Sequence, residues 1–355
     1  MTVAYIECWG GGGGGGSATP TGTTSEGTGG TSVGGTTSTG CPAGVICVDS
    51  LPFVDDDTTS GAPSMVDAYA CAPPTDESGP EVVYQVTLEE EGLLVGSLSG
   101  LPAGVDVDVH LLQALDPDTC LDRGHWDAAA LLEPGTYYVV VDSWVDASGQ
   151  SMEGDYTLTL ALDGYADHVS DGLSEDAWST ALTGFANAWA DGESDRLEYG
   201  VIDFSLPSTD HRFFVVDLRT GDLLFDLLAS HGSGSQDPTD DRYADHFSNV
   251  SGSYASSLGM LRAAETFDGD HGYSLRLDGL ESGWNDNVRD RAIIVHNADY
   301  ATQAFVDDYG YLGRSQGCPA VDPAFSADLI DTLRDGALIL GYYPDPDWLS
   351  ASPYL

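Results

Sequence analysis

The chain has 355 residues, of which 58 are Asp or Glu and only 11 are Lys or Arg, so its formal net charge is -47. All the cations are arginines, since the sequence contains no lysine. Proteins that hold nucleic acid, and those that dock to anionic lipid, need clustered basic residues. The composition therefore excludes a nucleic-acid partner and argues against an anionic membrane surface. The excess of carboxylates fits simple solubility or adaptation to high salt, which screens their repulsion.

The N-terminal segment has the composition of a tether. Residues 9–40 hold 14 Gly and 13 Ser or Thr, which cannot build a core, so we predict a disordered tether over residues 1–40. Cys8 stands just before it, as a lipidated cysteine does in a mature lipoprotein. Glu7 and Ile6 are unusual before a lipidation site, so either the true start lies upstream or Cys8 is an ordinary thiol. No apolar run reaches the roughly 18 residues of a transmembrane helix, and we predict none.

The other cysteines are unevenly placed. Four lie in the first folded block, which predicts two disulfides and an oxidising compartment, with three possible pairings. We favour Cys41–Cys47, which closes a short loop ahead of the strands, and Cys71–Cys120, which crosses them. Cys318 is then left without a partner. An unpaired cysteine in an extracytoplasmic protein is a candidate nucleophile, and the alternative is a packed small hydrophobe.

Residues 41–163 have the pattern of an antiparallel β-sandwich. Short segments rich in Val, Tyr, Thr and Leu are separated by turns that contain Gly, Pro and Asp. The predicted strands cover 81–88, 93–98, 105–112, 136–141 and 156–162.

One strand of this block contains Val105-Asp-Val-Asp-Val. Asp106 and Asp108 are suited to bind Ca²⁺, but an alternating strand also places such side chains on its solvated face. We favour the solvated face and predict no metal site and no cofactor.

Residues 164–355 predict a mixed β-fold with one or two helices. Apolar residues recur at helical spacing over 174–191, with Ser174 as the N-cap. Asp322 as N-cap, Pro323 and Gly336 predict a late helix. The predicted strands cover 197–205, 212–218, 223–229, 274–277, 291–296 and 337–343. The expected fold class is therefore mainly β, in two domains.

Two segments of this second block carry chemistry. The β-branched run Ile293-Ile-Val-His-Asn delivers His296 at the end of a buried strand, and Gly313-Arg-Ser-Gln-Gly-Cys-Pro holds Cys318 in a tight loop. A cysteine nucleophile needs a base within reach and donors for the developing oxyanion. We expect His296 as the base and the N–H groups of Gly317 and Cys318 as donors. A thiolate–imidazolium pair would lower the pKa of the thiol and raise that of the imidazole.

The motif Ser315–Cys318, SQGC, resembles the Ser-x-Gly-Cys signature of L,D-transpeptidases of the YkuD type. The segments FSN, SSLG, GDHGYSLRLDGLE, RAIIVHNADY and LGRSQGCPAV extend the resemblance over residues 195–343. Residues 48–162, through GPEVVYQV, VDVDVHLL, CLDRG, PGTYYVVVDSW and GDYTLTLAL, resemble the bacterial pre-peptidase C-terminal domain, a β-sandwich accessory module of secreted hydrolases.

The resemblance implies an acyltransferase that acts on peptidoglycan. Cys318 attacks the stem peptide at the carbonyl of its third residue, expels the terminal D-Ala, and leaves a thioester that an amine of another stem resolves. His296 is implied as base and later acid, and Gly317 with Cys318 as the oxyanion hole. Ser315 is expected to hydrogen-bond within the loop, and the backbone carbonyl of Asn297 to hold the imidazole tautomer.

The sequence departs from the common family pattern on both sides of Cys318. Gln316 stands where many relatives have a second histidine, and Pro319-Ala320 replaces the pair that usually supplies a cation for the substrate carboxylate. Arg314 is our substitute for that cation, and its alternative role is an ordinary structural salt bridge.

Three other histidines compete for a role in the site. His231 and His271 stand beside glycines and His246 precedes FSN, but they lack the spacing of a zinc site. We expect His271 to touch substrate.

Two rival functions stay open. On the same scaffold, water can resolve the thioester, which gives an L,D-carboxypeptidase or a hydrolase that cleaves cross-links. In another class, the chain is a protein that binds cell wall and in which Cys318 is inert. In each case we expect a periplasmic or cell-envelope location.

Overall fold

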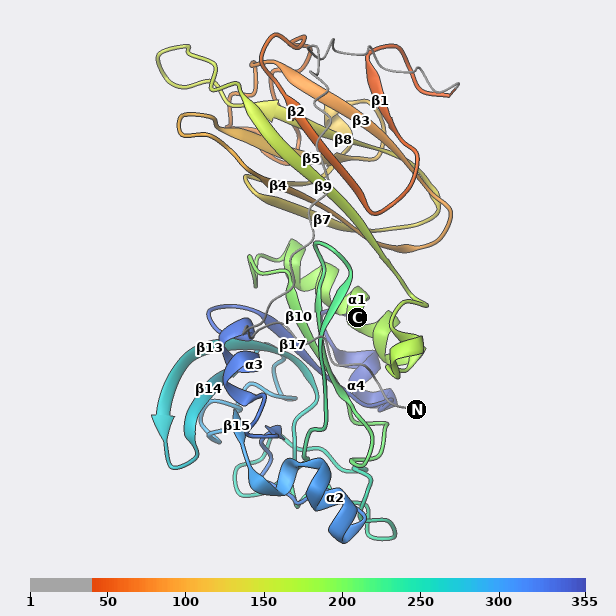
Figure 1. Ribbon diagram of the computed structural model, residues 1–355, viewed down its shortest axis with the longest axis vertical. Helices are drawn as coiled ribbons and strands as arrows, with labels where there is room; N and C mark the ends of the chain where they lie inside the picture. The colour runs from red at the N-terminus through yellow and green to blue at the C-terminus, as the bar shows by residue number, and fades with distance from the viewer. Residues whose placement is uncertain (1–39) are drawn as a thin grey trace, which may run out of the picture. The chain divides into compact units, whose positions relative to one another are not determined.

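The computed structural model describes residues 40–355. The predicted tether and the possible lipid anchor at Cys8 therefore lie outside the described residues. The described part is mainly β, as predicted, and three sheets account for its strands (Figure 1). No helix of residues 40–355 is long and apolar enough to cross a membrane.

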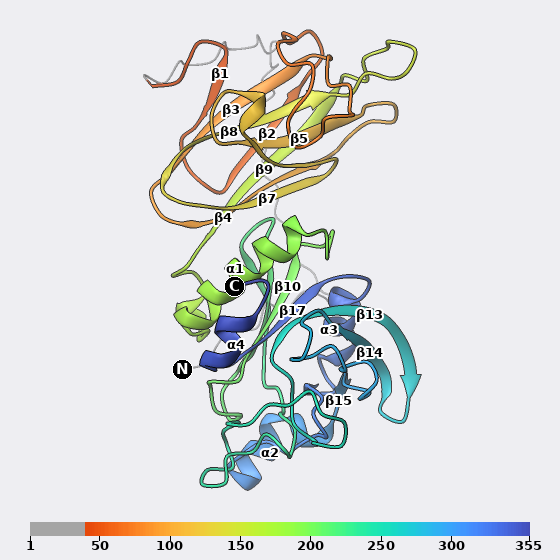
Figure 2. The ribbon, with the colours of Figure 1, turned by 180° about the vertical axis from the view of Figure 1, so that it is seen from behind.

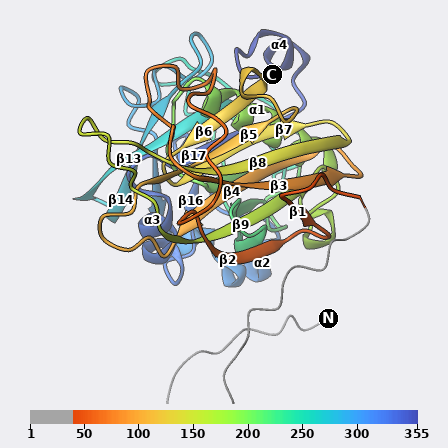
Figure 3. The ribbon, with the colours of Figure 1, turned by 90° about the horizontal axis from the view of Figure 1, so that it is seen from above.

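Two sheets build the N-terminal sandwich. Figure 3 looks onto the five-stranded sheet, in which β6, β5, β8, β3 and β1 lie side by side. The other sheet has the order β2-β9-β4-β7. The strands are β1 Val45–Val48, β2 Phe53–Thr58, β3 Glu81–Leu88, β4 Gly92–Ser99, β5 Val107–Leu112, β6 Cys120–Gly124, β7 Asp127–Leu132, β8 Gly135–Ser143 and β9 Asp155–Gly164.

The sandwich core comes from the inward side chains of both sheets. Val109, Val139 and Val141 of one sheet are fully buried against Leu158 and Leu160 of the other. Every predicted strand of this region is present. β1, β2, β6 and β7 were not predicted, and β1 pairs in parallel with β3 although we expected an antiparallel sandwich. β1 and β6 have only four and five residues, and β2 contains three consecutive Asp, so the alternation on which the prediction relied is not visible in their sequences.

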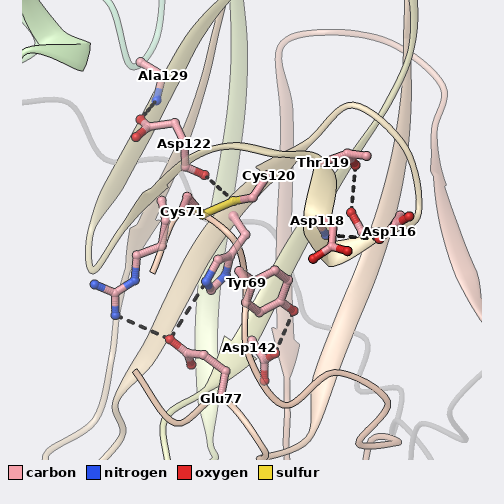
Figure 4. The surroundings of a disulfide bond; sticks show 12 residues. Tyr69, Cys71, Glu77, Asp116, Asp118, Thr119, Cys120, Asp122, Ala129 and Asp142 are labelled. Atoms are coloured by element: carbon pink, nitrogen blue, oxygen red, sulfur yellow. Dashed lines mark hydrogen bonds and ion pairs between the residues drawn. A yellow bond between two sulfur atoms is a disulfide. The ribbon is translucent and has the colours of Figure 1, made fainter. Parts of the chain in front are cut away.

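Both favoured disulfides are present. Cys41 is bonded to Cys47, and Cys71 to Cys120, whose surroundings are drawn in Figure 4. Cys318 is the one cysteine of residues 40–355 that forms no disulfide. The second bond ties the long connection between β2 and β3 to the start of β6, so this connection is held over the outer face of the five-stranded sheet.

An eight-stranded mixed sheet forms the centre of the C-terminal region. Its order is β12-β11-β10-β17-β13-β14-β15-β16, with parallel pairs at β10–β17 and β15–β16. The strands are β10 Glu198–Asp203, β11 Phe213–Asp217, β12 Asp222–Leu227, β13 Gly259–Gly269, β14 Gly272–Gly279, β15 Ile294–Asn297, β16 Ala320–Val321 and β17 Leu338–Tyr342. β13 was not predicted, because its outer half is polar and exposed.

Four α-helices accompany this sheet within residues 40–355: α1 Glu175–Ala190, α2 Gln303–Tyr309, α3 Ser326–Leu333 and α4 Pro346–Ala351 (Figure 2). Ser174 caps α1 as predicted, since its hydroxyl accepts a hydrogen bond from the Ala177 N–H. The N-cap prediction for α3 is wrong: Asp322 accepts from the Ala324 N–H in a turn, and the helix begins only at Ser326. Helices α2 and α4 were not predicted, because they are too short for a helical period to be recognised in the sequence.

Helix α1 joins the two regions. It packs on β10 and β17 on one side and on β4 and β7 on the other. Leu93, Val95 and Ala129 of the sandwich belong to the same buried cluster as Trp178 of α1. The predicted domain boundary at residue 163 falls at the end of β9, but the apolar core continues across it.

Candidate active site

A cleft of about 710 Å³ brings together most of the residues predicted to act. Cys318, His296, Ser315, Arg314 and His271 all line it. The other lining residues are Gly252, Tyr254, Phe267, Asp270, Arg276, Arg291, Ala292, Ile294, Tyr300 and Gln316.

Strand pairing explains why the cysteine and the histidine share this cleft. His296 is the residue before the last in β15, which pairs in parallel with β16 and places His296 opposite Ala320. Cys318 lies two residues before Ala320, so the loop that carries it arrives beside the histidine. On its other side β15 pairs with β14, where Leu275 is opposite Val295.

The cysteine loop is held by a serine inside it. The Ser315 hydroxyl donates to the Cys318 carbonyl at 2.6 Å and accepts from the Gly317 N–H at 3.1 Å. Ser256 donates to the Gly317 carbonyl at 3.2 Å. The two hydrogen bonds of the Ser315 hydroxyl are those within the loop that the sequence predicts.

Gly317 is required by geometry rather than by the oxyanion. Its φ is +119°, and a Cβ there would lie 2.6 Å from the Ala255 carbonyl oxygen and 2.7 Å from Ile293 Cδ1. Its N–H donates to the Ser315 hydroxyl in the protein without substrate, so its role as an oxyanion donor stays a prediction. The Cys318 N–H makes no hydrogen bond within residues 40–355 and is free to donate.

His296 is oriented through its own neighbour. Its Nδ1 lies 2.8 Å from the carbonyl oxygen of Asn297, and because a carbonyl only accepts, Nδ1 carries the proton. Nε2 is left as the basic nitrogen. Asn297 also donates from its side-chain amide to the His271 carbonyl at 2.8 Å, so it positions both histidines and does not line the cleft.

The two histidine rings stack. The ring centroids of His271 and His296 are 4.1 Å apart, with an interplanar angle of 26°. Burial lowers the pKa of His296, the hydrogen bond to Asn297 opposes this, and the charge of His271 lowers it further. His296 is therefore a neutral base across the physiological range.

Cys318 rests as a thiol. Its Sγ lies 3.6 Å from the Ala292 carbonyl oxygen, an acceptor, and no hydrogen bond joins Cys318 to His296 among the described residues. Burial raises the pKa of Cys318, while the Ile294 N–H and the Arg291 guanidinium act in the opposite direction. The expected shifts, a lowered thiol and a raised imidazole, are thus reversed here, because burial penalises both charged forms.

Arg314 lines the cleft but is not free. Its Nη2 lies 3.2 Å from an Asp241 carboxylate oxygen, and its guanidinium stacks over the Tyr311 ring at 4.7 Å. The salt bridge that we considered as its alternative role is therefore present, and its role as the cation for the substrate carboxylate stays a prediction.

The other two histidines do not line the cleft. His231 is buried, and its Nδ1 accepts a hydrogen bond from Arg212 Nη2 at 2.9 Å. Burial, together with the positive charge of Arg212, lowers the pKa of His231 to about 3. His231 still supports the site, since its backbone carbonyl accepts from the Ser315 N–H. His246 is exposed.

The sequence missed Arg276, Arg291 and Tyr300. Each lies alone between ordinary neighbours, and only strand pairing and loop packing bring it to the cleft. Burial raises the pKa of Tyr300 to about 12, and nearby Cys318 adds to that shift.

A second group of polar residues lies on the sandwich. Asp106, Asp108 and His125 each place one ligand atom within 4.8 Å of the others. The Arg123 guanidinium contacts Asp108, so the protein itself supplies a positive charge there. Asp108 is buried, and the prediction that it lies on a solvated face is wrong, because the connection between β2 and β3 covers it.

Comparison with known proteins finds one matching family model, in the C-terminal region. Residues 169–342 match the L,D-transpeptidase catalytic domain. This confirms the resemblance predicted from the cysteine and histidine motifs. No curated protein matches the chain.

Several solved structures are also similar. The L,D-transpeptidase from Mycobacterium smegmatis shares 12% identity over 70% of this chain and 82% of its own, with a TM-score of 0.27. The enzyme from Xylanimonas cellulosilytica shares 19% over 42% of this chain and 62% of its own, with a TM-score of 0.25. The pre-peptidase C-terminal domain of collagenase from Bacillus anthracis shares 16% over 35% of this chain and 98% of its own, with a TM-score of 0.23.

Proposed function

Residues 169–342 match the L,D-transpeptidase catalytic domain, and we propose that the protein is a cysteine-dependent L,D-transpeptidase that acts on peptidoglycan stem tetrapeptides. Cys318 is the nucleophile and His296 the general base. The observation that carries the proposal is that both line one cleft, which holds the one cysteine of residues 40–355 outside a disulfide and a histidine whose Nδ1–H is fixed by Asn297.

The proton balance follows from this arrangement. The Cys318 thiol gives its proton to His296 Nε2 while sulfur bonds to the carbonyl carbon of the third stem residue. The Cys318 N–H donates to the oxyanion. The amide C–N bond then breaks, His296 returns the proton to the amine of the departing D-Ala, and a thioester remains. An acceptor amine displaces the sulfur in the same manner, which forms a cross-link or exchanges the terminal residue.

The reaction starts from a neutral thiol and a neutral imidazole. Transfer of the proton must therefore accompany attack or follow substrate binding, since burial disfavours the ion pair in the free protein. Substrate that excludes water and brings its own polar groups changes this balance.

Arg314 and His271 are proposed to contact substrate. Arg314 presents part of a guanidinium to the cleft, while its bond to Asp241 limits how much of the charge is available. His271 lies over the base itself, so any contact that it makes with substrate is next to the reacting atoms.

We further propose an extracytoplasmic location. Two disulfides persist in an oxidising compartment, and the proposed substrate lies outside the cytoplasm. The possible lipid anchor at Cys8 is part of this proposal and is tested by the mass of the mature N-terminus.

The test uses purified full-length protein and a disaccharide-tetrapeptide. We expect release of D-Ala and an acyl-enzyme adduct on the Cys318 peptide, both detected by mass spectrometry and both lost in Cys318→Ala. The matched control is His246→Ala, an exposed residue away from the cleft, which retains both. Unchanged D-Ala release in Cys318→Ala would exclude the proposal.

The same assay separates the rivals. Cross-linked dimers, or incorporation of an added D-amino acid, indicate transpeptidation, whereas tripeptide alone indicates a hydrolase. Binding to cell wall without turnover or thiol alkylation identifies a protein with an inert Cys318.

A further inference from the structure

Almost every arginine of this acidic chain has a carboxylate partner. All of them lie within the described residues, and all but Arg212 and Arg291 form an ion pair with Asp or Glu. Arg212 is completely buried away from the cleft and bonds to His231 and two backbone carbonyls. Three arginines line the cleft, and Arg291 is the one that forms no ion pair with a carboxylate of residues 40–355.

The acceptors of Arg291 are all neutral and come from one segment. Nη1 donates to the Ser248 carbonyl at 2.5 Å and the Ser257 hydroxyl at 2.7 Å. Nη2 donates to the Ala255 carbonyl at 2.5 Å and the Ser253 hydroxyl at 3.2 Å. Four N–H groups are therefore satisfied and the guanidinium is held in place, but its charge is not neutralised.

The segment that holds this charge also contacts the cysteine loop. Arg291 precedes Ala292, whose carbonyl accepts from the Cys318 thiol at 3.6 Å. The segment that holds the guanidinium also holds the loop, since Ser256 donates to the Gly317 carbonyl. The attraction is mutual: Cys318 raises the pKa of Arg291 against the effect of burial, and Arg291 lowers that of the thiol.

The other charged groups of the cleft do not duplicate this role. Arg276 and Arg314 contact Glu265 and Asp241. Asp270, His271 and His296 approach from the connection between β13 and β14 and from β15, and Tyr254 and Tyr300 complete the titratable groups of the lining. None of these is a permanent cation without a counter-ion.

We propose that Arg291 is the fixed counter-charge of the Cys318 thiolate, a positioning residue that favours ionisation of the nucleophile. The anion that this guanidinium lacks in the resting protein is the sulfur itself once its proton has left. The inference rests on the proposed role of Cys318 as nucleophile, but its test needs no substrate. An opposite charge within about 4–6 Å commonly shifts a pKa by about 1–3 units.

The test is the rate of iodoacetamide alkylation of Cys318 against pH, in the full chain with its disulfides intact. Mass spectrometry of the Cys318 peptide separates it from Cys8. Arg291→Gln should raise the midpoint of the profile by about one unit or more, which leaves about tenfold less thiolate near neutral pH. Arg276→Gln, in the same cleft but paired with Glu265, should leave the midpoint unchanged. Arg291→Lys keeps the positive charge and should leave the midpoint close to that of the wild type.

Arg291→Gln also removes hydrogen bonds, so a second pair of variants separates charge from packing. Ser253→Asp provides a carboxylate to Nη2 while the arginine stays, and it should raise the midpoint. Ser253→Asn, of equal size and neutral, should not. Equal midpoints in wild type, Arg291→Gln and Ser253→Asp would overturn the inference, and if Arg291→Gln does not fold, the Ser253 pair decides.

The outcome is independent of turnover. Failure of D-Ala release with a shifted midpoint in Arg291→Gln rejects the proposed reaction but keeps the counter-charge. An unshifted midpoint with a raised KM for tetrapeptide assigns Arg291 to substrate binding and rejects the counter-charge.

Discussion

The sandwich and the cleft both remove ionisable groups from water, but they neutralise charge in different ways. On the outer face of the five-stranded sheet, Glu77 and Asp142 are buried (Figure 4), and so is Asp108. Burial raises the pKa of Glu77, and that of Asp142 to about 8, while Arg123 contacts Glu77 and Asp108. Here protonation and ion pairing neutralise the charge.

In the cleft the positive charge persists. Arg291 cannot lose its proton near neutral pH and has no carboxylate partner among the described residues, while Cys318 and His296 rest neutral beside it. The comparison indicates that the sandwich uses its polar groups for structure, whereas the cleft holds a charge that can act on a reacting atom. Substitutions in the cleft should therefore change chemistry, and those in the sandwich should change stability.

The largest expected effect is in the cleft. Cys318→Ala should reduce D-Ala release at least about a thousandfold, because no other described thiol can form the thioester. The midpoint of thermal unfolding, measured by circular dichroism, should change little because alanine fills the site without strain. A large loss of stability would make Cys318 a structural residue and remove the contrast between the regions.

Gly317→Ala should follow. The added Cβ meets the Ala255 carbonyl oxygen, and φ stays positive, so we expect a loss of about 1–3 kcal/mol in unfolding free energy and of about a hundredfold in activity as the loop shifts. Denaturant unfolding and D-Ala release provide the two measurements. Gly283→Ala is the control, since its φ is also positive but its Cβ meets nothing within 4 Å; equal effects in both variants would contradict the steric argument.

His271→Ala should have a smaller effect, visible in the pH profile. His271 lowers the pKa of its stacking partner, so its removal should raise the pKa of His296 and move the acid limb of the acylation rate to higher pH. The loss of rate at neutral pH should be about tenfold or less. The sequence alone predicted that His271 touches substrate, and an unmoved acid limb with a raised KM would favour that role over an effect on the pKa of His296.

The smallest effect concerns the sandwich. Glu77 is protonated in the folded state and ionised when unfolded, because burial raises its pKa. Stability should fall as pH rises from about 4.5 to about 9, the interval in which the unfolded chain has lost this proton and the folded protein still holds it. The side chain in Glu77→Gln stays neutral, so the fall of the melting temperature over this pH interval should be about 2–4 °C smaller than in the wild type. D-Ala release should be unchanged. Asp146→Asn, at an exposed position, should keep the wild-type dependence.

Much of this protein is readable in its sequence because the signals are local. Alternating apolar strands, the Ser174 cap and the flanking glycines depend on neighbours in the chain, and strands such as β3 and helix α1 appear where expected. The proposed nucleophile and base could be selected from the sequence because a Gly-Cys pair in a polar loop and a histidine at a strand end are compact motifs.

Other features depended on contacts between distant residues. Alternation placed Asp108 in solvent, but the connection between β2 and β3, tied by Cys71–Cys120, buries it. The charge states of Cys318 and His296 follow from desolvation, which no spacing reveals. The proposed role of Arg291 can be inferred only from the tertiary structure. To show that its guanidinium has no carboxylate partner, the positions of all the carboxylates around it must be known. The sequence determined which chemical groups are present and in what order. The tertiary structure decided which of them are buried away from water and which charges remain unpaired, because burial and ion pairing depend on the neighbours of a residue in space.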